Sequence, residues 1–406
     1  MTDPQRIERI LQVHTRYRQA GGEDEVVEAE KRLLTQAGLD VRQVTFDNAD
    51  LRESESLIGD LSLAASAIWS SAAKRRVGSV LDAHHSQVMH VHNTFTAASP
   101  SVYAAAAERG IPVVQTLHNY RLVCPAATVF RDGKSCTDCV GRPIPWPGVL
   151  HACVRGSRRQ SLVAGAMLTV HRARGTYARG VAAYVALTAF QREMMIDGGL
   201  PAARIRVVPN FLEPDPGPGP EGRTGLLFVG RLAVEKGIPV LLAAASAVPR
   251  AISVMGAGPL QDSVEGAAAA GLVTYLGSRS RTAVGDALRQ ASALVLPSNW
   301  FEGFPLVLLE AYASGTPVIA SRIGSLTDLV EDGVTGLHVA PNDAVELADL
   351  VRWAKIHPEE MRRMGANARS RYEGLYRGEA HLEALMSTYR SVVPMSRPGH
   401  AARVSS

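Results

Sequence analysis

The sequence predicts an α/β protein that contains two doubly wound parallel-sheet domains. Short runs of β-branched and apolar residues alternate with helical stretches along most of the chain, which is typical of βαβ units. The Pro- and Gly-rich stretch LEPDPGPGPEGRT, at 212–224, separates two such halves and has the composition of a linker. A chain of 406 residues is long enough for about two or three domains with cores of their own.

The composition excludes several classes of protein. Hydrophobic residues make up 46% of the chain and charged residues 20%, as in soluble globular proteins. A net charge of +4 is small for this length and argues against a nucleic-acid partner. The polar start MTDPQRIER does not resemble a secretory signal, and the apolar run SLVAGAMLTV at 161–170 is too short to span a bilayer. We therefore expect a cytoplasmic location.

The first half contains two strands that end in His and Asn, VMHVHN at 88–93 and VVQTLHN at 113–119. Upstream, Gly21 and Gly22 precede the first helix, where backbone N–H groups favour an anion; an ordinary strand-to-helix turn is the alternative. His118 ends the second strand and is a candidate site residue, although a lone histidine is more often structural. Weaker candidates are His14, His90 and His92.

All four cysteines lie in a Gly- and Pro-containing insertion at about 120–156. Cys136 and Cys139 form the motif CTDC, which has the spacing of a zinc knuckle. Cys124 and Cys153 would complete a four-sulfur structural zinc site that ties down a segment without a core of its own. Four reduced thiols, or one disulfide, are the alternatives.

The following segment, at 154–180, has an apolar centre with arginines around it. It could lie on an anionic membrane surface. A core helix with solvated arginine ends is the alternative. The arginines are Arg155, Arg158, Arg159, Arg172, Arg174 and Arg179.

The second half predicts five strands, at 226–230, 251–256, 272–277, 293–298 and 316–321. Each ends in Gly or a small polar residue. Ligands of open parallel sheets bind outside the carboxyl ends of the strands, so the residues that follow these strands should converge on one crevice. They are Gly230, Arg231, Lys236, Gly256, Gly258, Arg279, Ser298 and Glu302.

The stretch FEGFPLVLLE contains two carboxylates eight positions apart, Glu302 in a loop and Glu310 in an apolar helix at about 305–314. Pro305 suits the first turn of that helix, where its missing N–H is not needed. A buried carboxylate without a partner costs several kcal/mol, so Glu310 should have one. A salt bridge or capping role is one interpretation, and a ligand hydroxyl is the other.

Together these motifs resemble the retaining glycosyltransferases of family 4, which have the GT-B architecture of two Rossmann-like domains facing each other across a cleft. FEGFPLVLLE is similar to the E-x7-E motif of that family, and GRLAVEKG at 230–237 matches its G-R-L-x-x-x-K-G segment. HTRYRQAGGEDEVVEAEKRLLTQAGLDV at 14–41 looks like its glycine-rich opening loop and first helix. The resemblance covers nearly the whole chain; GAGPL at 256–260 would be weak alone.

The resemblance implies a role for each candidate residue. Glu310 is expected to bind the donor ribose, and Glu302 the hydroxyls of the donor sugar, together with the N–H groups of Gly303 and Phe304. His118 matches the family histidine that approaches the donor sugar. The remaining donor-binding candidates are Gly21, Gly22, Gly230, Gly256, Gly258, Arg279, Ser298, Pro305 and Leu306.

Arg231 and Lys236 lie five positions apart in one strand-to-helix loop, so both can reach one diphosphate, and a solvated loop is the alternative. Fixed cations aimed at developing charge are usually the largest catalytic contribution. The family is thought to use a front-face route in which the leaving phosphate helps to deprotonate the acceptor. A hydrolytic carboxylate pair is conceivable, but a glycosidase has no diphosphate for these cations to neutralise.

The resemblance divides the chain into an acceptor-binding domain at 1–212 and a nucleotide-sugar domain at 213–378. The insertion follows His118 and is expected to form part of the acceptor pocket. A helix at 379–393 is expected to cross back to the first domain, and the tail at 394–406 to be disordered.

The predicted function is transfer of a hexose, with retention, from a UDP- or GDP-sugar to a glycan or lipid-linked acceptor in bacterial-type polysaccharide or glycoconjugate biosynthesis. No catalytic metal is expected, because the sequence lacks an evident Asp-x-Asp pair. Peripheral contact with the inner membrane face would suit a lipid-linked acceptor. The alternatives are an epimerase or phosphorylase of the same fold, and a non-catalytic nucleotide-sugar binding protein; a cofactor-dependent phosphorylase would need a Schiff-base lysine, for which there is no clear candidate.

Overall fold

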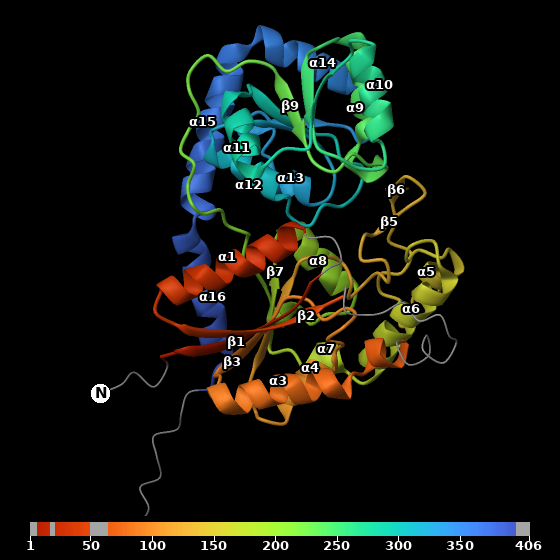
Figure 1. Ribbon diagram of the computed structural model, residues 1–406, viewed down its shortest axis with the longest axis vertical. Helices are drawn as coiled ribbons and strands as arrows, with labels where there is room; N and C mark the ends of the chain where they lie inside the picture. The colour runs from red at the N-terminus through yellow and green to blue at the C-terminus, as the bar shows by residue number, and fades with distance from the viewer. Residues whose placement is uncertain (1–5, 17–20, 49–63, 395–406) are drawn as a thin grey trace, which may run out of the picture.

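The computed structural model describes residues 6–16, 21–48 and 64–394. Two α/β lobes lie one above the other, each built on a six-stranded parallel sheet (Figure 1). This confirms the predicted fold class. Apart from residue 394, the tail at 394–406 lies outside the described residues.

The N-terminal sheet has the strand order β2-β1-β3-β4-β7-β8. Its strands are β1 (Arg9–Arg16), β2 (Asp40–Asp47), β3 (Val88–Val91), β4 (Val113–Leu117), β7 (Ala183–Ala186) and β8 (Ile205–Val207). Neighbouring residues of β1 point to opposite faces. Leu11 packs with α3 (Ser71–His84) and α4 (Ser101–Ala107), whereas Ile10 packs with α1 (Gly22–Gln36) and α16 (Gly378–Val392). Helices therefore cover both faces, which explains why the central strands are buried throughout.

The C-terminal sheet has the order β11-β10-β9-β12-β13-β14, which is the Rossmann order 3-2-1-4-5-6 when its strands are counted from β9. Its strands are β9 (Leu226–Val229), β10 (Ile252–Met255), β11 (Thr274–Gly277), β12 (Ala293–Leu296), β13 (Val318–Ser321) and β14 (Gly336–Val339). The strand order reverses between β9 and β12, so the loops after these two strands border the crevice where such folds bind ligands.

Helices also cover both faces of this second sheet. Phe228 packs in a cluster with α9 (Ile238–Ala247), α10 (Gln261–Ala269) and α14 (Ala344–Ile356). Leu227, its neighbour, packs in the opposite cluster with α11 (Arg281–Gln290), α12 (Leu306–Ala313) and α13 (Ser325–Leu329). The long helix α15 (Pro358–Leu375) contributes to both clusters.

The cysteine insertion contains a two-stranded hairpin and a short helix. These elements are β5 (Phe130–Arg131), β6 (Lys134–Ser135) and α5 (Trp146–Leu150). The arginine segment that follows forms α6 (Arg158–Ala173) and α7 (Thr176–Arg179). Met167 and Leu168 of α6 are buried in the N-terminal core, so this helix packs on the domain through one face. None of the helices among the described residues combines the length and apolarity needed to cross a bilayer.

Several contacts join the two lobes. The chain returns after α15, and α16 buries Leu385 and Tyr389 against the N-terminal sheet, where Figure 1 shows it in blue. On the other side, the amide of Phe190 in α8 (Ala189–Asp197) donates a hydrogen bond to Asp328 Oδ2 at 2.6 Å. Thr188 and Ser325 share a second hydrogen bond across the same boundary, at 2.9 Å.

Candidate active site

The loops after β9 and β12 are joined by an ion pair at the point where the strand order reverses. Lys236 ends a short 3-10 helix, Val234–Lys236, and its Nζ lies 2.8 Å and 2.9 Å from the two carboxylate oxygens of Glu302. Ser298 Oγ donates to Glu302 Oε1 at 2.7 Å. Glu302 is 5% exposed, so three groups of the predicted site are held together at a buried position.

Glu302 also lies directly beside the N-terminal domain. The buried Tyr120 hydroxyl donates to the Glu302 carbonyl at 3.2 Å. A Cβ atom added to Gly303 would lie 2.9 Å from the His118 carbonyl oxygen, closer than real Cβ contacts. The absence of a side chain at Gly303 therefore allows the His118 and Glu302 segments to approach each other across the domain boundary.

The glycines after β10 serve close backbone packing. A Cβ on Gly256 would lie 1.9 Å from the Gly230 carbonyl oxygen, and one on Gly258 would lie 2.6 Å from that of Leu232. The Leu232 amide donates to the Ala257 carbonyl at 2.9 Å. Glycine is required at these two positions because any side chain would separate the two loops.

Two of the predicted cations, Arg231 and Arg279, are exposed to solvent. Arg231 has a side chain that is 57% exposed, and its guanidinium pairs with Glu235 in the same loop. Arg279 is exposed between β11 and α11. Lys236 is less exposed than Arg231, at 25% of its side chain. The structure thus brings Lys236, Ser298 and Glu302 together and leaves the two arginines open to solvent.

Glu310 has a protein partner in Arg281, the first residue of α11. Arg281 Nε lies 3.3 Å from Glu310 Oε1, and the same guanidinium donates to Glu25 Oε2 of α1 at 2.6 Å. Burial raises the pKa of Glu310, and Arg281 opposes that rise. In this conformation Glu310 therefore forms a salt bridge, which is one of the two interpretations given above. Its partner Arg281 also contacts Glu25 of α1, and so connects Glu310 to the N-terminal domain.

The N-terminus of α12 faces the N-terminus of α1. Pro305 caps α12, Phe304 is buried before it, and a Cβ on Gly22 would lie 3.1 Å from Leu306 Cδ1. Gly21 is the N-cap of α1, and its amide donates to Asp24 Oδ2 at 3.2 Å.

The first turn of α1 carries three acidic residues, which complement the helix dipole. They lie at the helix N-terminus, where Gly21 and Gly22 led us to expect a bound anion. Glu23 is 12% exposed, and burial together with the neighbouring Asp24 raises its pKa to about 8. His14, which resembles part of the family's opening loop, instead lies buried in β1 and contacts Asp24 Oδ1 at 2.7 Å.

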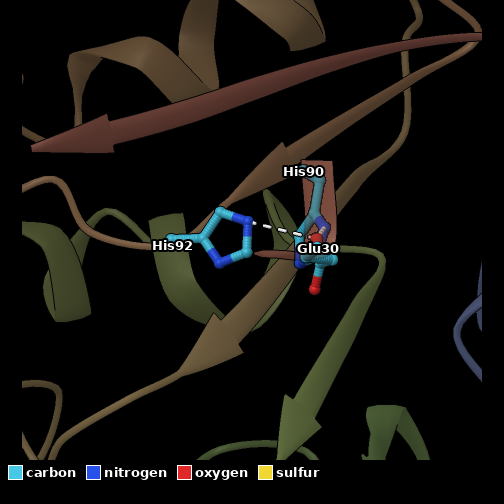
Figure 2. Close-up of side chains that lie close together, drawn as sticks. All are labelled: Glu30, His90 and His92. Carbon is cyan, nitrogen blue, oxygen red and sulfur yellow. Dashed lines mark ion pairs between the residues drawn. The ribbon is translucent and has the colours of Figure 1, made fainter. Parts of the chain in front are cut away.

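His118 is half-buried and lies at the outer end of a row of histidines whose other members, His92 and His90, are buried. Its Nε2 lies 3.0 Å from His92 Nδ1, and the two rings stack with centroids 5.3 Å apart. Burial and the neighbouring histidines hold the pKa of His118 well below its usual range. Figure 2 shows His92 beside Glu30 and His90. Glu30 Oε1 lies 3.0 Å from His90 Nδ1 and 3.3 Å from His92 Nε2. A neutral imidazole at the domain boundary follows from this arrangement.

Sequence analysis missed Glu23, Glu30, Tyr120 and Arg281. Glu30 had a detectable signal, because it occupies the apolar face of α1 with Val26, Val27, Leu33 and Leu34, where a carboxylate is unexpected. Arg281 and Tyr120 had none, since their roles depend on contacts between domains.

The four cysteines approach one another without forming a closed ligand set. Burial, with a smaller contribution from the other three thiols, raises the pKa of Cys139 to about 11. Among the described residues, the one group of three His, Cys, Asp or Glu ligand atoms within 4.8 Å of one another is Glu30, His90 and His92. The zinc site therefore stays a prediction.

Solved structures share this architecture along nearly the whole chain. A glycosyltransferase from Rickettsia africae superposes with a TM-score of 0.66 at 15% identity and covers 95% of this chain and 98% of its own. Anabaena HepE, in complex with UDP and glucose, has a TM-score of 0.63 at 16% identity, with 95% and 100% covered. The fold is the GT-B fold of glycosyltransferases.

Residues 15–210 match the family described as glycosyl transferase 4-like domain, and residues 213–371 match that described as glycosyl transferases group 1. The chain belongs to the family 4-type glycosyltransferases.

Curated relatives match over part of their length. The D-rhamnosyltransferase WbpZ of Pseudomonas aeruginosa is 37% identical over 155 residues, which are 37% of this chain and 41% of that protein. The glycogen synthase of Mycobacterium tuberculosis is 32% identical over 244 residues, or 56% and 58%. The chain thus matches about half the length of these relatives.

Proposed function

We propose that this protein is a retaining glycosyltransferase, which moves a hexose from a nucleotide diphosphate-sugar to a glycan or lipid-linked acceptor. The observation that carries the proposal is the Lys236–Glu302–Ser298 group at the reversal of the strand order, directly beside His118. Such a site offers a cation for the leaving diphosphate and hydrogen-bonding groups for the sugar.

In this proposal Lys236 turns from Glu302 toward the diphosphate when the donor binds, and Arg231 joins it from the rim. Glu302 then accepts hydrogen bonds from sugar hydroxyls, and Glu310 exchanges Arg281 for the donor ribose. Neither carboxylate acts as a covalent nucleophile. Retention comes from attack on the face from which the diphosphate leaves, with a diphosphate oxygen taking the acceptor's proton. This chain's cations stabilise the charge, so we propose no catalytic metal.

A UDP-sugar is the donor class that we favour. Solved neighbours of the same fold include HepE with UDP and glucose and HepE with UDP-glucose. WbpZ is a D-rhamnosyltransferase by name, and a second relative is a glycogen synthase. Both names support sugar transfer, the second one to a glycan, and together they do not select one hexose. We also propose that the product is a polysaccharide or glycoconjugate and that its synthesis takes place in the bacterial cytoplasm.

We further propose that the insertion and α6 contact the inner membrane face when the acceptor is lipid-linked. Exposed apolar side chains gather on α5, α6 and the loop before α5, where Arg158 and Arg159 are also exposed. Apolar anchors beside cations suit an anionic lipid surface. The apolar residues are Ile144, Trp146, Leu150 and Leu162, each more than half exposed.

Sedimentation with vesicles tests this membrane contact. We expect binding to phosphatidylglycerol-containing vesicles, weaker binding to phosphatidylcholine alone, and a loss of binding in the double variant Arg158→Gln/Arg159→Gln. The control is Arg362→Gln/Arg363→Gln on α15, which removes the same charge from the other domain. Equal binding by both double variants would contradict the proposed surface.

The first experiment is thermal denaturation with UDP, GDP, ADP and dTDP, each with and without EDTA. A nucleotide at 100 times its dissociation constant should stabilise the fold by about 2.7 kcal/mol. We expect one nucleotide to do so in the presence of EDTA, and not in Glu310→Ala. If none binds, the transferase proposal and the alternatives that share the crevice all fail.

Turnover assays separate the remaining alternatives. Conversion of a nucleotide-sugar without any acceptor would favour an epimerase, and phosphate-dependent release of a sugar phosphate would favour a phosphorylase. Nucleotide-sugar binding with no turnover on any acceptor would favour a non-catalytic binding protein.

A further inference from the structure

A buried carboxylate lies two side chains behind His118, the histidine that follows β4. Glu30 is 1% exposed on α1, and its Oε1 lies 3.3 Å from His92 Nε2. His92 Nδ1 in turn lies 3.0 Å from His118 Nε2. His118 is half-buried at the end of β4, whereas His92 and Glu30 are enclosed. Glu30, His92 and His118 thus form a row that leads from the core to the domain boundary.

The chemistry of this row selects one tautomer. A carboxylate only accepts hydrogen bonds, so it favours a proton on His92 Nε2, the atom that faces it. His92 is neutral at pH 7, because burial and the neighbouring His90 lower its pKa to about 4. With its single proton on Nε2, His92 presents a bare Nδ1 to His118, and that atom must receive a proton from His118 Nε2. His118 then carries no proton on Nδ1.

Other side chains hold the Glu30 carboxylate in this place. Gln12 Nε2 donates to Glu30 Oε1 at 2.8 Å, and His381 Nε2 of α16 lies 3.4 Å from Oε2. His90 Nδ1 lies 3.0 Å from Oε1. Although burial alone would raise it, the pKa of Glu30 stays well below its usual range because His90 and His92 favour the anion. The carboxylate is therefore charged and oriented when no substrate is present.

We propose that Glu30 is a positioning residue for catalysis: acting through His92, it fixes the tautomer and ring orientation of His118. A carboxylate that orients a catalytic imidazole is an established arrangement in hydrolases. In this protein the imidazole of His92 lies between the Glu30 carboxylate and His118. The inference rests on the proposed function, in which His118 faces the donor sugar.

A cation between Glu30, His90 and His92 is the competing interpretation of the same atoms. The distances between ligand atoms would allow one. Two of these atoms already have polar partners, however: Gln12 donates to Glu30 Oε1, and the Tyr389 hydroxyl lies 2.7 Å from His90 Nδ1. A cation would have to displace both, so the direct contacts of Glu30 with His92 and of His92 with His118 are favoured.

The substitution that tests the proposal is Glu30→Gln, which keeps the shape of the side chain and removes its charge. Tyr389→Phe is the matched control, because it removes a buried hydrogen bond to His90 and leaves the row intact. Glu30→Asp is the conservative variant. The titratable groups that face the row, and that are unchanged in every variant, are His14, Glu23, Asp24, His90 and His381, with Lys236 and Glu302 across the boundary.

The first readout needs no substrate. In protein with 15N-labelled histidine, long-range 15N–1H correlation identifies the protonated nitrogen of His118, with His118→Gln for assignment. We expect a proton on Nε2 in the wild type and in Tyr389→Phe, and a mixture of tautomers or a proton on Nδ1 in Glu30→Gln. An unchanged His118 tautomer in Glu30→Gln would overturn the proposal.

The second readout is kinetic, with donor concentration and pH both varied. We expect Glu30→Gln to lower kcat by about 10–100-fold, with the donor KM within about threefold, since binding groups are untouched. Glu30→Asp should recover part of the loss, the pH profile of kcat should shift in Glu30→Gln, and Tyr389→Phe should retain kcat within about twofold. Equal losses in Glu30→Gln and Tyr389→Phe, in proportion to lost thermal stability, would assign a merely structural role.

Metal analysis completes the test. One equivalent of metal in the wild type that disappears in Glu30→Gln would overturn the proposal in favour of a metal site. If the wild type turns over no nucleotide-sugar, the proposed function fails, whereas the tautomer measurement still decides the role of Glu30.

Discussion

Lys236 and Glu302 form an ion pair although they lie 66 positions apart in the sequence. Lys236 Nζ lies 2.8 Å and 2.9 Å from the two carboxylate oxygens of Glu302. They come from loops after different strands, which the reversal of strand order between β9 and β12 makes neighbours. Each holds the other in place before any donor binds. When a donor binds, its diphosphate would replace Glu302 as the partner of Lys236, and its sugar hydroxyls would replace Lys236 as the partner of Glu302.

Lys236→Ala is expected to lose about 10²–10³ in kcat, because it removes one fixed cation from the developing diphosphate charge. The measurement is initial rate of sugar transfer at saturating donor. Lys355→Ala, on the exposed side of α14, is the control and should be unchanged. Turnover close to wild type in Lys236→Ala would sink the assigned role.

Two single substitutions distinguish the role of Glu310 from that of its partner Arg281. Glu310→Ala should lose about 10²–10³ in rate, as expected when one transition-state contact is removed, and should lose nucleotide-dependent stabilisation. Arg281→Ala removes the protein partner and keeps the carboxylate, so nucleotide should still stabilise it. Thermal denaturation with and without nucleotide compares the two. If both variants behave alike, Glu310 acts through its salt bridge and not through the ribose.

Glu23 should make stability depend on pH. Its pKa is raised in the folded state to about 8, from an ordinary value of 4.5, so the folded protein holds a proton that the unfolded chain releases. That contribution is fully present below pH 4.5 and is lost progressively as pH rises to about 8, at about 1.4 kcal/mol per pH unit within the window.

Glu23→Gln removes this titration. Its stability relative to wild type should therefore rise between pH 5 and pH 8, measured as the difference in denaturant midpoint at each pH. Comparing the two proteins at the same pH cancels the contributions of all other groups. Parallel curves across this range would mean that Glu23 is ionised in the folded protein.

The zinc prediction has a direct measurement. If the four thiols bind zinc, the purified protein should contain about one zinc per chain and release it in Cys136→Ser with a lower melting temperature. Cys136 is the informative position because it is part of the CTDC pair and is partly exposed. Four thiols that react with a thiol reagent after unfolding, without metal, would support the reduced alternative.

Most of the C-terminal sheet could be predicted from sequence, because each apolar run ended at a glycine or a small polar residue. The runs at 226–230 and 251–256 correspond to β9 and β10, which end one residue before Gly230 and Gly256. The helix predicted at 305–314 corresponds to α12, at Leu306–Ala313. The short strand β14 was missed: GLHV has four residues and no distinctive pattern.

The amino-acid sequence was enough to predict the two α/β halves and the segments that carry Lys236, Glu302 and Glu310. It could do so because alternating burial, turn residues and short motifs are local properties of the chain. Local patterns also set which face of an element is buried. They do not set which other element covers that face.

The partners of these side chains could not be predicted from local patterns, because they come from distant parts of the chain. Arg281 meets Glu25 across 256 positions, and His381 reaches Glu30 across 351 positions. These contacts depend on the strand order, on the return of α16 to the first sheet, and on the packing of one domain against the other. The Glu30 carboxylate can be noticed in the sequence, because it is an exception on the apolar face of a helix. Its proposed target, His118, can be identified only from the structure, where the ends of β3 and β4 lie beside α1.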